Sequence, residues 1–162
     1  MGYIDDSYLQ GDTRDECYRL TIISTARLFT ELGFYTHPNK SVFLPTQILT
    51  FLGFILDSIK MTISPTPEKI GKIVEACRQM VKKPTPLILD LARVIGLIIS
   101  LFPGAEFGYL HYRVLDHDKT HALAANAGNF NMPMKLSEAS IQELLWWIIY
   151  APQAKKHISY PR

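Results

Sequence analysis

Cysteine is scarce in this sequence, and its scarcity excludes two kinds of small stabilised domain. The only cysteines, Cys17 and Cys77, lie far apart, with no CxxC pair and no cluster of further ligands around either. Neither a disulfide framework nor a zinc knuckle is therefore indicated, and a reducing compartment fits best.

An excess of one charge sign is also absent. Seventeen basic and fifteen acidic side chains leave a formal net charge of +2. A dedicated nucleic-acid-binding domain usually carries a strong basic excess, so any basic surface here must be local.

Long apolar runs are missing as well. Acidic residues such as Asp5, Asp6 and Asp12 occupy the place where a signal peptide needs an apolar stretch. The most apolar run, residues 87–102, carries Asp90 and Arg93 and is short for a membrane span. We therefore expect an intracellular protein, cytoplasmic or nuclear, that is not secreted and has no membrane partner.

The residues that are present predict an α+β fold. With 48% hydrophobic and 20% charged residues, a chain of 162 residues can form a packed core. The first part predicts a short hairpin around Asp5 and Asp6, then a helix opened by Thr13, running to Leu32 and ended by Gly33. A strand within residues 34–43 and a hairpin centred on Asp57-Ser58 follow, so the β region ends near Ser64.

Helices dominate after that point. Thr66-Pro67 and Thr85-Pro86 each place a favoured N-cap residue before a proline at the first helical position. They predict two helices, the second covering residues 87–101. A last helix is predicted from Ser137 to Tyr150. Residues 105–134 are expected to be looser, and the tail from residue 151 to be a linker or an extended strand.

The stretch Tyr3-Ile4-Asp5-Asp6 carries the clearest chemical signal. Adjacent aspartates are common in turns, and that interpretation stays open. Phosphoryl transfer through two magnesium ions, however, needs carboxylates that converge on cations about 4 Å apart. Because neighbouring strand residues point to opposite faces, we expect Asp5 to bind metal while Asp6 helps from the side.

These four residues resemble the Y-x-D-D signature in the palm of reverse transcriptases, and further motifs follow in the family's order. "GFYTHPNKS" at residues 33–41 resembles the loop G-F-x-x-x-P-x-K-S, and Leu52-Gly53-Phe54 resembles the L-G-F primer grip. The C-terminal half is similar to the thumb and connection of retrotransposon enzymes, most like tyrosine-recombinase (DIRS-like) or LTR-type retroelements.

The resemblance implies a partial reverse-transcriptase palm with β-hairpins backed by a helix at residues 1–64, a helical thumb at 65–103 and a connection at 104–162. The implied activity is RNA-directed DNA polymerase, a two-metal nucleotidyl transfer onto a primer 3′ end. Mg²⁺, or Mn²⁺, is the implied cofactor, and primer-template and dNTP are the implied partners.

The family also needs a third palm aspartate, the fingers and commonly a ribonuclease H domain, and none of these is found in the sequence. We therefore expect a fragment that is inactive alone and needs the missing segments of the same polyprotein, or a decayed mobile-element remnant. A non-catalytic nucleic-acid-binding module is the alternative from another functional class.

The expected site residues follow from the motifs. Asp5 and Asp6 are the metal-binding pair, and Lys40 is expected to help the triphosphate or the leaving pyrophosphate, unless it is only a solvated turn lysine. Gly53 is expected to let the backbone approach the primer, and an ordinary bulge glycine is the alternative interpretation. The residues expected to contact nucleic acid are Tyr3, Leu52, Gly53, Phe54, Lys69, Lys72 and Arg78. For the three basic residues, the alternative is that they only form a solvent-exposed face of their helix.

Two further patterns, a histidine pair and a tryptophan pair, have more than one interpretation. His117 and His121 have the i, i+4 spacing of a helical metal pair, but no glutamate follows the first histidine and no third ligand is evident, so we expect no metal site there. Trp146 and Trp147 can stack on bases, pack in a core or contact a neighbouring domain, and we expect the last of these.

Overall fold

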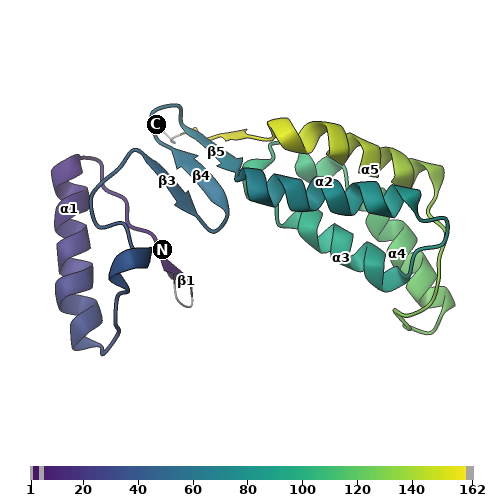
Figure 1. Cartoon of the computed structure of the whole chain (residues 1–162), viewed down its shortest axis with the longest axis horizontal. Helices are drawn as coiled ribbons and strands as arrows, with labels where there is room; N and C mark the ends of the chain where they lie inside the picture. Colours follow the sequence, from purple (N-terminus) through teal and green to yellow (C-terminus); the bar gives the residue numbers. More distant parts are fainter. Residues whose placement is uncertain (1, 4–5, 160–162) are drawn as a thin grey trace. The chain divides into compact units, whose positions relative to one another are not determined.

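The chain has an α+β fold made of two compact units, residues 1–47 and 48–162 (Figure 1). The computed structural model describes residues 6–159 and the backbone of Gly2 and Tyr3. No helix in this described part is long and apolar enough to cross a membrane. The boundary at residue 47 assigns the L-G-F segment and the hairpin predicted at Asp57-Ser58 to the second unit. The functional boundaries expected at residues 64 and 103 stay predictions.

The first unit begins with the expected hairpin. Strands β1 (Gly2–Tyr3) and β2 (Asp6–Ser7) pair antiparallel, with Tyr3 opposite Asp6. Helix α1 (Arg14–Ile22) follows, and Thr13 caps it by accepting a hydrogen bond from the backbone N–H of Glu16. The Glu16 carboxylate accepts from the N–H of Asp12, the residue before the cap. Thr13 therefore opens the helix as predicted.

The predicted helix continues to its expected end but changes its winding. Residues Ile23–Phe29 form a π-helical segment, η1, before Gly33 leaves the helix with a φ of 78°. The hydroxyl of Thr21 donates to the carbonyl of Cys17, and the hydroxyl of Thr25 donates to that of Thr21. Such back-bonding by β-branched residues loosens the ordinary α-helical pattern.

The strand predicted within residues 34–43 is wrong. The segment is irregular and contains only the 3₁₀ turn η2 (Pro38–Lys40). Pro38 has no N–H to donate to a sheet, and no strand of the described chain pairs with this segment.

The second unit opens with a four-stranded antiparallel sheet in the order β3-β4-β5-β6. Its strands are β3 (Ile48–Phe51), β4 (Phe54–Asp57), β5 (Thr62–Pro65) and β6 (Lys156–His157). The hairpin predicted at Asp57-Ser58 is confirmed, and the Asp57 carboxylate accepts the N–H groups of Ile59 and Lys60 in its turn. The extended-strand alternative for the tail is confirmed by β6, which places Lys156 and His157 beside β5.

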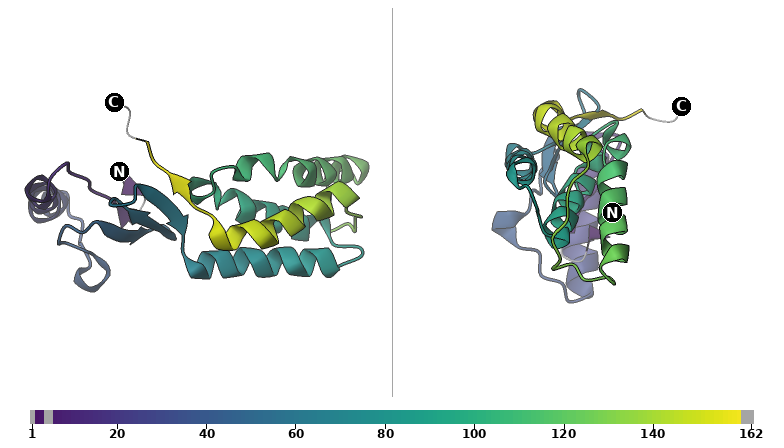
Figure 2. Two further views of the ribbon diagram at one scale, coloured as in Figure 1. Left: turned by 90° about the horizontal axis from the view of Figure 1, so that it is seen from above. Right: turned by 90° about the vertical axis from the view of Figure 1, so that its right-hand side faces the viewer.

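The helices of this unit lie side by side (Figures 1 and 2). They are α2 (Pro67–Lys82), α3 (Ile88–Ile99), α4 (Arg113–Ala125) and α5 (Glu138–Tyr150), with 3₁₀ turns η3 (Phe102–Gly104), η4 (Gly108–Leu110) and η5 (Ala151–Gln153). Thr66 and Ser137 cap α2 and α5 as predicted. Helix α4 was not expected, because its apolar side is weakly marked in the sequence.

The cap predicted for α3 at Thr85 is wrong. The helix begins two residues later, after Leu87, without a side-chain cap. A crossing segment satisfies its first N–H groups instead: Ile88 donates to the carbonyl of Met132, and Leu89 donates to that of Phe130. A backbone partner from far along the chain has replaced the local cap.

The hydrophobic core belongs to the second unit. Buried residues from all four helices form one cluster, with Ile73, Cys77, Leu91, Leu115 and Trp147 among them. No described side chain of residues 6–47 is buried. Apolar packing therefore stabilises the helical unit far more than the N-terminal unit.

Candidate nucleic-acid interface

The L-G-F motif forms the tight turn between β3 and β4. Leu52 and Gly53 have φ values of 51° and 79°, so both central residues lie in the left-handed region, as in a type I′ hairpin turn. Such a turn favours glycine, and Leu52 adopts the same region at some cost. The Leu52 side chain is exposed at the tip of the turn.

Two contacts fix this turn against the helical part of the same unit. The carbonyl of Gly53 accepts a 3.0 Å hydrogen bond from the N–H of Thr66, the residue that caps α2. Phe54 is only 7% exposed, and a Cβ at Gly104 would lie 2.9 Å from its ring. The Phe54 ring is therefore a support beneath the turn rather than a surface for a ligand.

Lys69, in the first turn of α2, completes the arrangement. Its Nζ lies 4.3 Å from the centroid of the Phe54 ring. Its side chain also fills the space above Gly53, because a Cβ there would be 3.2 Å from Lys69 Cδ. Partial burial lowers the pKa of the lysine, while the face of an aromatic ring attracts the ammonium group. The turn thus carries a cation in a fixed place beside a glycine backbone.

The other expected basic residues are placed less favourably. The ammonium of Lys72 lies 2.8 Å from Glu68, and this hydrogen bond holds the pKa of the exposed Glu68 carboxyl below its usual value. Arg78 is exposed but lies about two and a half helical turns from Lys69, and therefore on the opposite flank of α2. Lys69 and Lys72 can share one ligand near the turn, whereas Arg78 faces elsewhere.

The expected catalytic residues belong to the first unit. Asp6 is exposed on β2, and Lys40 is exposed at the end of the 3₁₀ turn η2. Asp5 and the side chain of Tyr3 lie outside what the structure describes. Among the residues that it does describe, no group of three or more His, Cys, Asp or Glu side chains is arranged to hold a metal ion.

The tandem tryptophans do not offer a free stacking surface. Trp147 is fully buried in the core, and its Nε1 donates a 2.6 Å hydrogen bond to the carbonyl of His111. The ring of Trp146 stacks on His111, with centroids 3.7 Å apart, and on Tyr150, with centroids 4.3 Å apart. The expectation of a contact with a neighbouring domain is therefore wrong for Trp147, which is a core residue.

No pattern in the sequence indicated the contact between Phe54 and Lys69. The two residues belong to different elements, and only the pairing of β4 with β5 brings the start of α2 back to the turn. The basic pattern of α2 identified Lys69 as a candidate, but not its distinction from Lys72 and Arg78.

Comparisons of the chain with models of known protein families, with curated proteins and with solved structures found no match in any of the three.

Proposed function

We propose that this chain is the C-terminal palm, thumb and connection region of a retroelement RNA-directed DNA polymerase. The proposal is supported by three motifs in the family's order: Y-x-D-D at residues 3–6, "GFYTHPNKS" at 33–41 and L-G-F at 52–54. Tyr3 and Asp6, the first and last residues of that signature, pair with each other in two short antiparallel strands.

The arrangement of Gly53 and Lys69 is the observation that carries the proposal. Because Gly53 has no side chain, the Lys69 side chain can lie over the turn, so a nucleic-acid strand that approaches the turn meets this lysine. Beside it, the Lys69 ammonium is positioned by the Phe54 ring and can contact a phosphate. Because these groups are held by the packed core of one unit, little ordering is needed when the strand binds.

The chemistry assigned to Asp5 and Asp6, the acidic residues of the first hairpin (the acidic hairpin), is two-metal nucleotidyl transfer. Asp5 and Asp6 provide carboxylate oxygens, the ligands that Mg²⁺ prefers, and a further carboxylate comes from another palm segment. With the metals bound, charge on the transferring phosphoryl group is neutralised. Lys40 is the proposed cation at the leaving pyrophosphate.

A non-catalytic nucleic-acid-binding module is the second candidate. It is favoured by the location of Gly53, Phe54 and Lys69 entirely within the second unit, which has its own core. In that module Lys69 keeps its phosphate contact, but Asp5 and Asp6 only shape a turn. The two functions therefore differ in their need for the acidic hairpin.

Binding of a fluorescent RNA–DNA primer-template, followed by anisotropy over a range of salt concentrations, tests the interface. We expect Lys69→Met to weaken binding and to reduce the slope of log K against log salt by about one unit, since one phosphate contact is lost. Lys60→Met is the matched control, because Lys60 is exposed in the turn at the other end of β4.

Equal affinity and equal salt slope for Lys69→Met and the wild-type chain would contradict the interface. Equal losses for the two variants would show a general effect of charge instead of a contact at the turn. Addition of Mg²⁺ then separates the two candidate functions, because only the polymerase proposal predicts divalent-metal binding that is lost in Asp5→Asn once the remaining palm segment is supplied.

A further inference from the structure

Helix α4 places two histidines on one exposed face. His117 and His121 are one helical turn apart, and their ring centroids lie 6.2 Å apart with only 22° between the ring planes. Both side chains are exposed. This unexpected helix therefore brings together two imidazoles in the relationship that helical metal pairs use.

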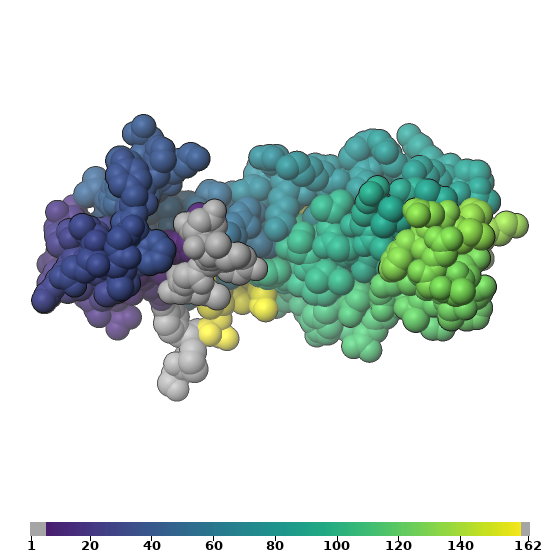
Figure 3. Space-filling view, turned by 90° about the horizontal axis from the view of Figure 1, so that it is seen from below, coloured from purple at the N-terminus to yellow at the C-terminus, as the bar shows by residue number. Residues whose placement is uncertain are grey.

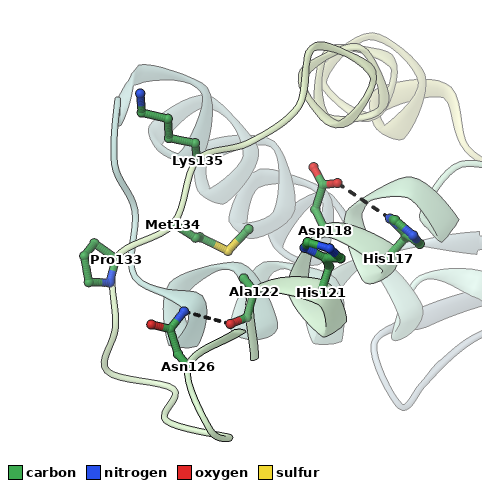
Figure 4. A pocket seen from close by; sticks show the side chains of 8 residues that line it. All are labelled: His117, Asp118, His121, Ala122, Asn126, Pro133, Met134 and Lys135. Atoms are coloured by element: carbon green, nitrogen blue, oxygen red, sulfur yellow. Dashed lines mark hydrogen bonds and ion pairs between the residues drawn. The ribbon is translucent and has the colours of Figure 1, made fainter. Parts of the chain in front are cut away.

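The two rings border a cavity of about 340 Å³ (Figure 4). Its lining includes His117, Asp118, His121, Asn126, Met134 and Lys135. Figure 4 shows the Lys135 ammonium directed away from the histidines. The segment from α4 to the start of α5 lies on the surface of the second unit, in green to yellow-green in Figure 3, so the cavity is open to solvent.

Asp118 gives this pair a feature that surface histidines usually lack. Its Oδ2 accepts hydrogen bonds from the backbone N–H of Ser137, at 2.9 Å, and from the hydroxyl of the fully buried Ser140, at 2.7 Å. Its Oδ1 lies 3.9 Å from His117 Nδ1. The carboxylate is thus anchored to the start of α5 while its second oxygen is directed at the imidazole.

The distance of 3.9 Å between Asp118 Oδ1 and His117 Nδ1 is too long for a hydrogen bond, so Asp118 can orient His117 only after the two groups move closer together. When they do, Nδ1–H donates to the carboxylate, and the lone pair then lies on Nε2. Histidines that bind metals commonly donate their other ring N–H to a carboxylate in this way, which fixes the ring and raises its basicity. Lys119, two residues from each histidine and thus on another side of α4, is paired with Asp116 at 2.6 Å.

We propose that His117 and His121 bind one divalent transition-metal ion of the Zn²⁺, Ni²⁺ or Cu²⁺ class, with Asp118 as the positioning residue for His117. Imidazole ligands select these ions, whereas Mg²⁺ prefers oxygen ligands, so the site is separate from the magnesium chemistry proposed above. Water completes the coordination within the cavity. The site departs from the expectation based on sequence, which contained no sign of the cavity or of the anchored carboxylate.

Isothermal titration of the full chain with Zn²⁺ or Ni²⁺, in a buffer free of phosphate, tests the site. We expect one ion per chain, and at least about a tenfold loss of affinity in His117→Asn and in His121→Asn, which corresponds to about 1.4 kcal/mol. His37→Asn is the matched control, since His37 is an exposed histidine outside helix α4. Unchanged affinity in the two α4 variants, or no binding by the wild-type chain, would overturn the proposal.

The role of Asp118 is tested by a measurement that a purely structural effect of the substitution would leave unchanged, namely the tautomer of His117. We expect Asp118→Asn to weaken binding by about 10-fold to 100-fold and to shift the ¹⁵N resonances of His117 toward the other tautomer. Ser140→Ala, which removes one anchor of the carboxylate, provides a second variant if Asp118→Asn does not fold. Native ¹⁵N shifts and native affinity in a folded variant would contradict the positioning role.

Discussion

The ammonium group of Lys69 lies 4.3 Å from the centroid of the Phe54 ring, directly beside the turn that Leu52 and Gly53 form. One buried aromatic ring therefore supports the turn from below and holds a cation at its side. The arrangement depends on Gly53, because any larger residue there crowds the lysine side chain.

Gly53→Ala is expected to lower the free energy of unfolding by about 1–2 kcal/mol, because alanine disfavours a positive φ. The new Cβ also displaces Lys69, so the affinity for primer-template falls as well. Urea unfolding measures the stability. Gly71→Ala is the control: Gly71 lies within α2 with open space around it, so alanine is expected to raise the stability by about 0.5–1 kcal/mol. A neutral or stabilising Gly53→Ala would contradict the strained turn.

Local signals in the sequence predicted several elements correctly, and contacts between distant segments account for the errors. Capping residues located α1, α2 and α5, since their hydrogen bonds join neighbours in the chain. The start of α3 was misplaced because the carbonyl groups of Phe130 and Met132 replace a local cap.

The candidate sites show the same division. The L-G-F motif identified the turn, and the basic pattern identified α2. Neither could reveal that Phe54 is buried or that Asp118 is anchored by Ser140. Those facts depend on how strands and helices pack, which the residue order near each position does not contain.

Trp147 is expected to be essential for the helical core. Trp147→Ala should lower the free energy of unfolding by about 3–5 kcal/mol, since the side chain is fully buried. Trp147→Phe should cost about 1–3 kcal/mol, because the carbonyl of His111 loses its donor. Ile149→Ala, at a residue that is 72% exposed on the same helix, should change the stability by less than about 0.5 kcal/mol. Similar effects at both positions would contradict the assigned core.

Asp118 is expected to make the stability of the chain depend on pH. Burial tends to raise the pKa of its carboxyl, but hydrogen bonds from Ser137 and Ser140 outweigh burial and leave the pKa below the usual value. A carboxyl with a lowered folded pKa stabilises the fold above its unfolded pKa, about 3.9, and this contribution is lost as the pH falls through the folded value. Urea unfolding of the wild-type chain and Asp118→Asn should therefore give stabilities that converge in acid. A constant difference at every pH would contradict this account.

The two units should differ in hydrogen exchange. Amides of α1 are expected to exchange much faster than those of α2 and α3, because no side chain of α1 is buried while both of the other helices contribute to the core. Native-state exchange followed by mass spectrometry measures both regions in one experiment. Equal protection of α1 and α3 would show that the first unit is stabilised by contacts other than apolar burial.

Primer extension tests the central claim most directly. The chain is joined in frame to a polymerase segment that provides fingers and the remaining palm aspartate, and incorporation of dNTP onto an RNA–DNA primer-template is measured with Mg²⁺ present. The account predicts extension that Asp5→Asn nearly abolishes, while Asp15→Asn, at an exposed position in the first turn of α1, leaves the rate unchanged. Extension by Asp5→Asn at the wild-type rate would contradict the assignment of the acidic hairpin to catalysis.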